Sequence, residues 1–323
     1  MLLEKTCRTI GAIVALGFGI NLISSAPAEA QTVNRKQELA GAAAAYTALI
    51  YESRVLDEIA SRYPDLADEI GAARSRFQAK FGTAVDAIST ELSDHAPEAA
   101  VTAANAAQDT LQKHDPVPDR QSAIKELVNF EGFAKGAIDP PELRKTLLYW
   151  RYRANPVAEM LDGFTETFDP DESSKDLRLS LIYPMSWKVM EGDPHLLGEI
   201  WSHSGVGVAS LHIAVHDIGP VVSASEVTDA FKGAKVINKT EADIAGYPGN
   251  VYLIDDQDKS QGVNVAERIL VSSVHLGSKT VDFIFIVSVP QARAGELNDD
   301  WDRYQPLIKA ITATIKLAVP QGD

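Results

Sequence analysis

Two histidines in one apolar segment are the first residues whose type and spacing could support chemistry. His212 and His216 alternate with apolar side chains, a pattern typical of a half-buried strand, so both lie on the same face of that strand. Four residues along a strand separate side chains by about 13 Å, too far for both to bind one zinc ion at about 2.1 Å. A metal site would need His195 or His203 to join one of them. We expect surface or strand-pairing histidines, no metal and no cofactor.

A serine follows one of these histidines, in the segment Ser204-Gly205-Val206-Gly207. The nucleophile elbow of a hydrolase requires glycines two positions before and after the serine, and this segment lacks that spacing. The chain also contains no H-E-x-x-H motif and no phosphate-binding glycine loop. We therefore predict a tight turn here, no catalytic residue, and a protein that is not an enzyme. A hydrolase with its site between two domains stays the alternative, because triads built from distant residues leave no local motif.

One aromatic and basic cluster stands out in an acidic chain, at residues 149–153. Aromatic and arginine side chains are the usual anchors of protein interfaces, so Tyr149, Trp150, Arg151 and Arg153 are candidate binding residues for a protein partner. The alternative is core packing, because Trp150 continues the apolar stripe of a predicted helix and the arginines would be solvated beside it. We favour core packing and keep the four residues as the candidate interface.

The elements that would position these residues change in type at about residue 165. Before that point the chain is rich in alanine and its apolar residues recur every three or four positions, which predicts amphipathic helices packed as a bundle. The expected helices cover residues 39–63, 66–92, 97–113, 121–135, 141–150 and 156–164. Their expected buried stripes include Leu39, Tyr46, Leu49, Leu56, Ala60 and Tyr63 in the first helix, Leu66, Ile70, Ala73, Phe77, Phe81, Ala84, Ile88 and Leu92 in the second, and Ile124, Leu127, Val128 and Ala134 in the fourth.

A polar segment at residues 166–176 follows, which we interpret as a linker, and after it the apolar period falls to two. Strands are expected at residues 177–183, 206–217, 235–244, 250–255, 263–275 and 279–289, with helices at 223–232 and 301–315. The acidic run Asp255-Asp256-Gln257-Asp258 lacks the glycine and final glutamate of a calcium loop, so we expect a solvated hairpin tip there. This order predicts an α+β protein, with a helical bundle before an antiparallel sheet.

Three short segments of the second half share a family pattern. They are Leu181–Lys188 with its Tyr-Pro-x-x-Trp box, the hairpin Ile244–Pro248, and the helix end Ile311–Lys316. Through them, residues 177–317 resemble the Mog/PsbP-like superfamily, which includes PsbP, DcrB and the LpqN/LpqT-like proteins. The resemblance implies an antiparallel sheet with helices packed against it, and a binding or assembly role. It also implies that Tyr183, Pro184 and Trp187 close the core at a strand end instead of lining a ligand pocket.

The first thirty residues have the pattern of an export signal. Lys5 and Arg8 precede the apolar run Ile10–Ile23, and Ala28-Glu29-Ala30 supplies the small residues of a cleavage site. The run is shorter than the about 20 residues that a membrane-spanning helix needs, so we expect cleavage after Ala30 and no membrane insertion afterwards. The only cysteine, Cys7, would leave with this segment, and the mature chain would hold no disulfide. These features predict a periplasmic or secreted bacterial protein.

The formal net charge of −15 argues against nucleic-acid binding, which depends on Lys and Arg neutralising phosphates. We predict a signal peptide at 1–30, a helical domain at 31–165, a linker at 166–176 and a Mog/PsbP-like domain at 177–318. The expected function is that of an exported, soluble, non-catalytic binding or assembly factor of the bacterial cell envelope, with an envelope protein as partner. The alternatives are the hydrolase above and a carrier of a small apolar ligand.

Overall fold

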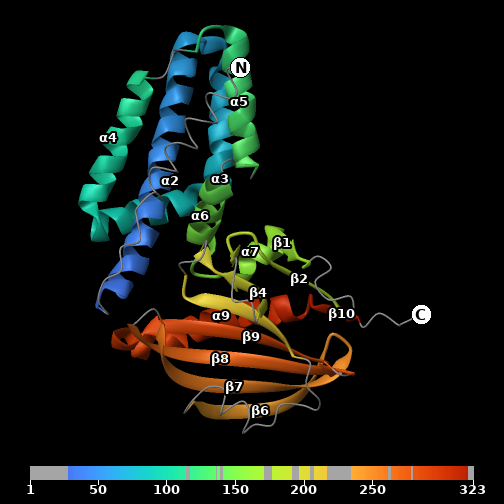
Figure 1. The fold of residues 1–323 in the computed structure, drawn as a ribbon. Helices are drawn as coiled ribbons and strands as arrows, with labels where there is room; N and C mark the ends of the chain where they lie inside the picture. Colours follow the sequence, from blue (N-terminus) through green and yellow to red (C-terminus); the bar gives the residue numbers. More distant parts are fainter. Residues whose placement is uncertain are drawn as a thin grey trace. The chain divides into compact units, whose positions relative to one another are not determined.

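The structure is a computed structural model, and it describes residues 28–113, 117–135, 137–138, 141–170, 177–190, 196–203, 207–216, 234–260, 263–277 and 279–318. The chain forms two compact units, which consist mainly of residues 33–153 and 154–323 (Figure 1). The first unit is helical and the second combines strands with helices, so the predicted α+β class is confirmed. The division falls between Arg153 and Ala154, which is N-terminal to the predicted linker.

Prolines and one capping side chain mark the starts of helices in the first unit. Pro97 and Pro141 are the first residues of their helices, where a missing N–H breaks no hydrogen bond. The Asp119 carboxylate accepts a hydrogen bond from the Ser122 N–H at 2.8 Å and so caps the helix that begins at Arg120. The helices are α2 (Ala28–Arg62), α3 (Ala67–His95), α4 (Pro97–Lys113), α5 (Arg120–Ala134) and α6 (Pro141–Tyr152), with the short 3-10 helix η1 (Pro64–Leu66) after α2.

Helix α3 is the centre of this unit and contacts α4, α5 and α6. Its predicted stripe is confirmed, since the eight residues that make up the stripe, of which Leu66 is the first and Leu92 the last, are all buried. In α5 the prediction is partly wrong: Leu127 and Ala134 are buried, but Ile124 and Val128 are 38% and 61% exposed. The larger rings of Phe130 and Phe133 occupy the inward face in their place.

The buried face of α2 is also rotated from the predicted one. Of the predicted stripe, only Leu56 is buried, while Leu39, Tyr46, Leu49, Ala60 and Tyr63 are half-buried. Small side chains let neighbouring helices approach closely, and alanines form much of the inward face. The fully inward residues are Ala42, Ala45, Ala48, Tyr51, Val55, Leu56 and Ile59.

The second unit is built on antiparallel strands. A seven-stranded sheet has the order β3-β4-β5-β9-β8-β7-β6, and a smaller sheet has the order β1-β2-β10. Residues 177–183 alternate between buried and less buried positions, as predicted for a half-buried strand. The elements are α7 (Val157–Leu161), β1 (Thr165–Phe168), β2 (Arg178–Pro184), β3 (Lys188–Met190), β4 (Leu196–Trp201), β5 (Ala209–His216), β6 (Lys235–Ile244), β7 (Tyr247–Ser260), β8 (Val263–Leu276), β9 (Lys279–Pro290), the 3-10 helix η3 (Gln291–Glu296), α9 (Leu297–Thr312) and β10 (Lys316–Ala318).

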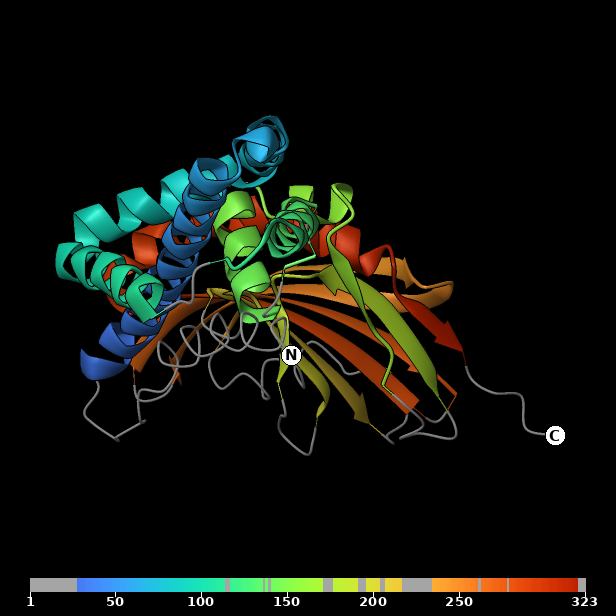
Figure 2. The same ribbon diagram turned by 90° about the horizontal axis from the view of Figure 1, so that it is seen from above.

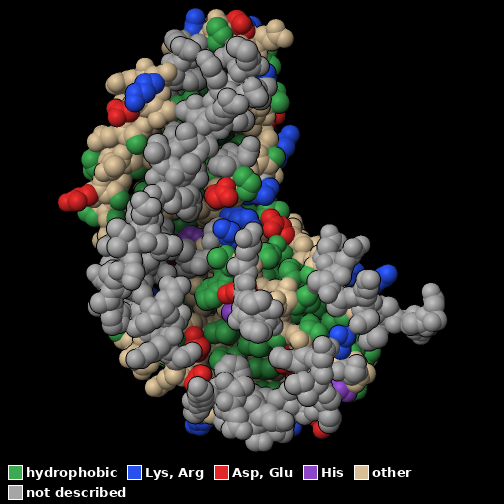
Figure 3. Space-filling model, viewed as in Figure 1, with side chains coloured by type: hydrophobic (Ala, Val, Ile, Leu, Met, Phe, Trp, Pro, Cys, Tyr) green, Lys and Arg blue, Asp and Glu red, His purple; other side chains and the backbone are tan. Residues whose placement is uncertain are grey.

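The C-terminal helix α9 covers one face of the large sheet, against β8 and β9 (Figure 2). Helix α9 begins at Leu297, four residues before the predicted start, and Pro306 lies inside it. Trp187 is buried in the core below α9, with its ring 6.4 Å from that of Tyr304, which confirms that the Tyr-Pro-x-x-Trp box closes the core. On the opposite sheet face, hydrophobic side chains gather over the strands (Figure 3).

The hairpin predicted at residues 244–248 is present. Ala245 and Gly246 both have positive φ, at 55° and 87°, which is the conformation of a two-residue turn between antiparallel strands. The predicted tip at Asp255–Asp258 is wrong, because these residues pair with β8 inside β7. The Asp255 carboxylate accepts two hydrogen bonds from Arg268 across the strands, at 2.7 and 3.0 Å, so this charge is satisfied within the sheet.

Part of the predicted linker is structured. Residues Thr165–Phe168 form β1 and pair with β2, and Phe168 is buried against Gly198, where a larger residue would collide with its ring. The polar composition of this segment hides the strand because only one of its side chains points into the core. Several predicted features lie outside the described residues: residues 1–27 of the export signal, residues 171–176 of the linker, His195, Ser204–Val206 and the helix at 223–232.

Candidate functional site

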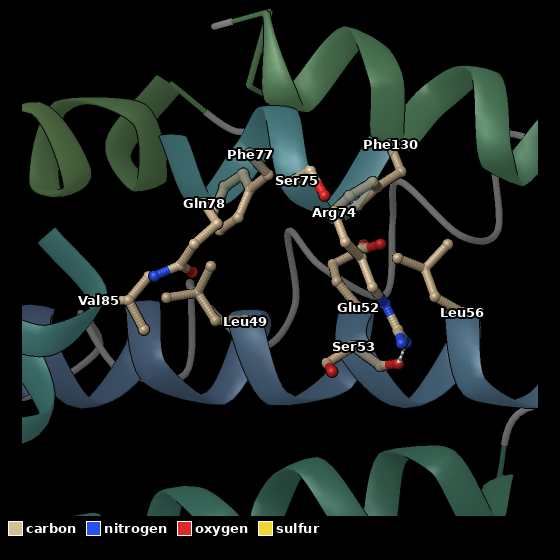
Figure 4. A pocket seen from close by; sticks show the side chains of 10 residues that line it. All are labelled: Leu49, Glu52, Ser53, Leu56, Arg74, Ser75, Phe77, Gln78, Val85 and Phe130. Carbon is tan, nitrogen blue, oxygen red and sulfur yellow. Dashed lines mark hydrogen bonds between the residues drawn. The ribbon is translucent and has the colours of Figure 1, made fainter. Parts of the chain in front are cut away.

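A cavity of about 610 Å³ opens in the helical unit between α2, α3 and α5 (Figure 4). Its size lies within the roughly 300–1,000 Å³ typical of small-molecule sites. Apolar atoms make up most of its wall, and a few polar side chains interrupt them. The lining residues are Leu49, Glu52, Ser53, Leu56, Arg74, Ser75, Phe77, Gln78, Val85 and Phe130.

Aromatic rings form the apolar wall of this cavity. Phe77 on α3 and Phe130 on α5 line it, with their ring centroids 5.6 Å apart. Behind them, Phe133 lies 5.5 Å from Phe77 and 6.0 Å from Phe130, and Phe81 lies 5.4 Å from Phe77. Four rings packed at these distances hold one another in place, so the wall is preformed and a ligand need not order it.

Glu52 brings a carboxyl group into this apolar space. Its side chain extends from α2 into the space between α2 and α3 (Figure 4). Burial raises the pKa of Glu52 to about 7, and the nearby carboxylate of Glu126 on α5 adds to the rise. At neutral pH the group is therefore divided between its protonated and ionised forms. No hydrogen bond or ion pair joins the Glu52 carboxyl to another residue that the structure describes.

Arg74 is the basic residue of the cavity wall, and its guanidinium is bonded to groups of α2 other than the Glu52 carboxyl. Its guanidinium donates hydrogen bonds to the Ser53 carbonyl oxygen at 2.9 Å and to the Asp57 carboxylate at 2.6 Å, both on α2. In Figure 4 the guanidinium extends to the α2 backbone and the hydrogen bond to Ser53 is drawn. Asp57 thus compensates the charge of Arg74, and the Glu52 carboxyl is left for a ligand.

The sequence carries a local signal for this site that its short motifs do not show. Glu52 lies three residues after Leu49 and four before Leu56, so it interrupts an apolar stripe on the same side of α2. An ionisable group within such a stripe is expensive to bury and is often functional. The nearness of Glu126, however, follows from the packing of α5 and has no local sequence pattern.

The candidate interface residues 149–153 make contacts inside the helical unit. Trp150 is buried, and the Arg153 guanidinium stacks over its ring at 4.9 Å while donating a hydrogen bond to Glu91 on α3 at 3.1 Å. Tyr149 donates a hydrogen bond to Glu38 on α2 at 3.3 Å. Arg151 lies over the Tyr152 ring at 4.9 Å. These contacts connect α6 to α2 and α3, in agreement with the core-packing interpretation, and a partner at these residues stays a prediction.

The histidine cluster holds one serine–histidine pair. His212 Nε2 lies 2.9 Å from Ser210 Oγ, and its ring stands edge-on to Trp201 at 5.8 Å. Burial lowers the pKa of His212, against an opposing effect of Glu199 on the neighbouring strand, so the ring is neutral at pH 7. Ser210 is 3% exposed, which closes its hydroxyl to a substrate. Within the described residues, no group of three His, Cys, Asp or Glu side chains could hold a metal ion.

His203 and His216 lie near the ends of β4 and β5. His203 is buried two residues after the end of β4, with a positive φ of 47°. His216 is the last residue of β5, and its side chain lies outside the described set.

A second cavity of about 380 Å³ lies in this unit between the 245–246 turn and α9, with Lys309 and Asp243 among its lining residues.

Comparison with known proteins gives distant similarities only. No protein-family model and no curated protein matches the chain. LpqN of Mycobacterium tuberculosis, a protein involved in cell envelope biogenesis, aligns with a TM-score of 0.32 and 10% identity over 50% of this chain and 94% of LpqN. A Bacteroides thetaiotaomicron protein aligns at 0.26 and 12% identity, over 44% of this chain and 45% of that one. A Pseudomonas aeruginosa protein of unknown function aligns at 0.26 and 11% identity, over 50% and 100% of the two chains.

Membership of the Mog/PsbP-like superfamily therefore stays a prediction from the Leu181–Lys188, Ile244–Pro248 and Ile311–Lys316 segments. Of the helices that the structure describes, none has the length and apolar character needed to cross a membrane.

Proposed function

We propose that the protein is an exported, non-catalytic binding protein of the bacterial cell envelope, and that its helical unit carries a small, mainly apolar ligand. The cavity between α2, α3 and α5 is the observation that supports this function most directly. It combines an apolar wall with a few polar groups, the composition expected of a small-molecule site. The export signal pattern at residues 1–30 supports the location.

A carrier function suits this cavity better than catalysis. Its lining residues include one carboxyl group, Glu52, and one arginine that is already paired with Asp57. The Ser75 hydroxyl in the same wall is bonded to the Gly71 carbonyl oxygen and has no base arranged beside it as a hydrolase would need. The aromatic wall and the half-buried Leu49 offer dispersion contacts and shelter from water, which is what an apolar ligand requires.

The test is binding of N-phenyl-1-naphthylamine, an apolar dye that fluoresces when it leaves water. The full chain without residues 1–30 should increase its fluorescence saturably. Leu49→Trp, which places a larger side chain in the cavity wall, should abolish the increase. Val128→Trp is the matched control, because this position is exposed on α5 and does not line the cavity. Equal dye binding by both variants would refute the proposed site.

The location is tested separately by the mass of the protein recovered from a bacterial envelope fraction. Cleavage after Ala30 gives a chain that begins at Gln31. A protein that keeps residues 1–30, or that is found only in the cytoplasm, would contradict export.

A further inference from the structure

We infer that the ligand of the helical cavity carries a cationic head group on an apolar body, as a primary alkylamine does, and that the Glu52 carboxylate is its counter-ion. This inference rests on the proposed function, because it takes the cavity to be the binding site. It adds the chemical class of the ligand and the residue that selects it.

The position of Glu52 is the first support. A carboxyl group in an apolar wall needs a partner to offset the loss of its hydration, and no described residue supplies one. An ammonium group placed beside it would supply charge and three hydrogen-bond donors together. The faces of Phe77 and Phe130, which line the same space, attract a cation as well.

The charges around the cavity favour a cation over an anion. Glu126 on α5 faces Glu52, and both Asp57 and the Tyr51 hydroxyl lie on the same helix as Glu52. Arg74 on α3 is the one basic residue among the described lining residues, and Asp57 already neutralises it. A carboxylate ligand would add a further negative charge beside Glu52, and two such groups in contact cannot both ionise. A neutral alcohol could bond to Glu52 but would leave its charge uncompensated.

Proton binding competes with the cation at this site. Since the pKa of Glu52 is about 7 in the free protein, most of the group is ionised at pH 8 and about a tenth is ionised at pH 6. An alkylamine that binds the ionised form should therefore lose about tenfold in affinity between pH 8 and pH 6. The affinity of an alcohol with the same chain should not fall in this interval.

The experiment compares decylamine, decanol and decanoate as competitors of N-phenyl-1-naphthylamine at pH 8. We expect decylamine to bind about tenfold or more tightly than decanol, the gain of a charged hydrogen bond, and decanoate to bind most weakly. Glu52→Gln should remove the preference for the amine over decanol and the pH dependence of that preference. Glu69→Gln, an exposed substitution on α3 away from the lining residues, should change neither.

The outcomes separate the two proposals. If the dye binds and Leu49→Trp abolishes this, but decanol or decanoate competes as well as decylamine, the cationic ligand is refuted and the carrier function stands. If the amine preference survives Glu52→Gln, Glu52 is not the counter-ion. If the dye shows no saturable binding to the wild type, the proposed function fails and the inference fails with it. Calorimetry of decylamine in two buffers at pH 7 should show release of Glu52 protons on binding, a readout that a merely structural role of Glu52 would not give.

Discussion

Replacing Glu159 by alanine should loosen the Tyr-Pro-x-x-Trp box from the rest of the second unit. Glu159 lies on α7 and is only 2% exposed. Its carboxylate accepts hydrogen bonds from the Ser186 N–H at 2.6 Å and from the Ser186 hydroxyl at 2.7 Å. Ser186 immediately precedes Trp187, so these two bonds hold the turn that places the tryptophan against Tyr304.

The expected loss follows from the two bonds and from what remains after the substitution. Hydrogen bonds to charged groups contribute about 1.5–3 kcal/mol each, and a buried N–H left without an acceptor adds to the loss. The substitution also removes the cost of burying a carboxylate, which offsets part of this sum. We expect Glu159→Ala to lower the free energy of unfolding by about 2–4 kcal/mol. Ser186→Ala, which deletes the hydroxyl and keeps the N–H bond, should cost about 1–2 kcal/mol.

Urea unfolding followed by tryptophan fluorescence measures this loss in the full chain. Three of the four tryptophans, Trp187, Trp201 and Trp301, belong to the second unit, so the signal reports mainly on it. Glu241→Ala on the exposed strand β6 is the control and should change the midpoint little. A Glu159→Ala loss below about 1 kcal/mol, or a double variant with Ser186→Ala that adds the two losses in full, would show that the two residues are not coupled and would refute the reasoning.

Three further predictions concern single residues. Trp187→Ala should cost the second unit about 3–5 kcal/mol in urea unfolding, the range for emptying a buried aromatic site, and a loss below about 1 kcal/mol would contradict its place in the core. Gly246→Ala should lower the free energy of unfolding by about 1–2 kcal/mol, because Gly246 has a φ of 87° in the hairpin turn. Gly71→Ala in α3 should instead stabilise its helix by about 0.5–1 kcal/mol, because the added methyl group meets nothing within 4 Å. Equal effects of the two variants on thermal unfolding would contradict this. Glu52→Gln should stabilise the helical unit at pH 8 and not at pH 4. The folded-state pKa of Glu52, about 7, lies above the ordinary 4.5, so the wild type loses about 1–2 kcal/mol of stability as the pH rises from 4.5 through 7, after allowance for partial solvent exposure. Far-UV circular dichroism melts measure the gain, and an equal gain at both pH values would refute the assignment.

Sequence periodicity predicted those elements in which one face carries all the large apolar residues. In α3, the regular spacing from Leu66 to Leu92 leaves a single apolar face, so only one orientation buries it. In α5, two faces compete, because Ile124 and Val128 lie on one side and Phe130 and Phe133 on another. The structure buries the phenylalanines, which remove more apolar area from water, and this choice depends on the rings that α3 presents.

Charge placement was harder to predict than apolar placement. The run Asp255–Asp258 has the composition of a loop, yet it is paired inside β7 because Arg268 lies opposite Asp255 on β8. Nothing near Asp255 in the sequence indicates this partner. The same limit applies to the cavity: Glu52 interrupts an apolar stripe, which is visible in the sequence, but its raised pKa depends on burial and on Glu126 from a distant helix.

The strand β6 has a consequence for the behaviour of the protein at high concentration. It lies at one end of the described seven-stranded sheet, and an unpaired strand edge is a template on which another chain can add a strand. Most of its side chains are exposed, including the charges of Lys235, Lys239, Glu241 and Asp243, and its register shifts between Val236 and Asn238. A foreign strand would have to match this irregular backbone and place its own side chains among charges of both signs. The edge therefore resists the sheet-to-sheet pairing that leads to aggregation, and a concentrated solution of the protein should stay free of assemblies that grow through β6.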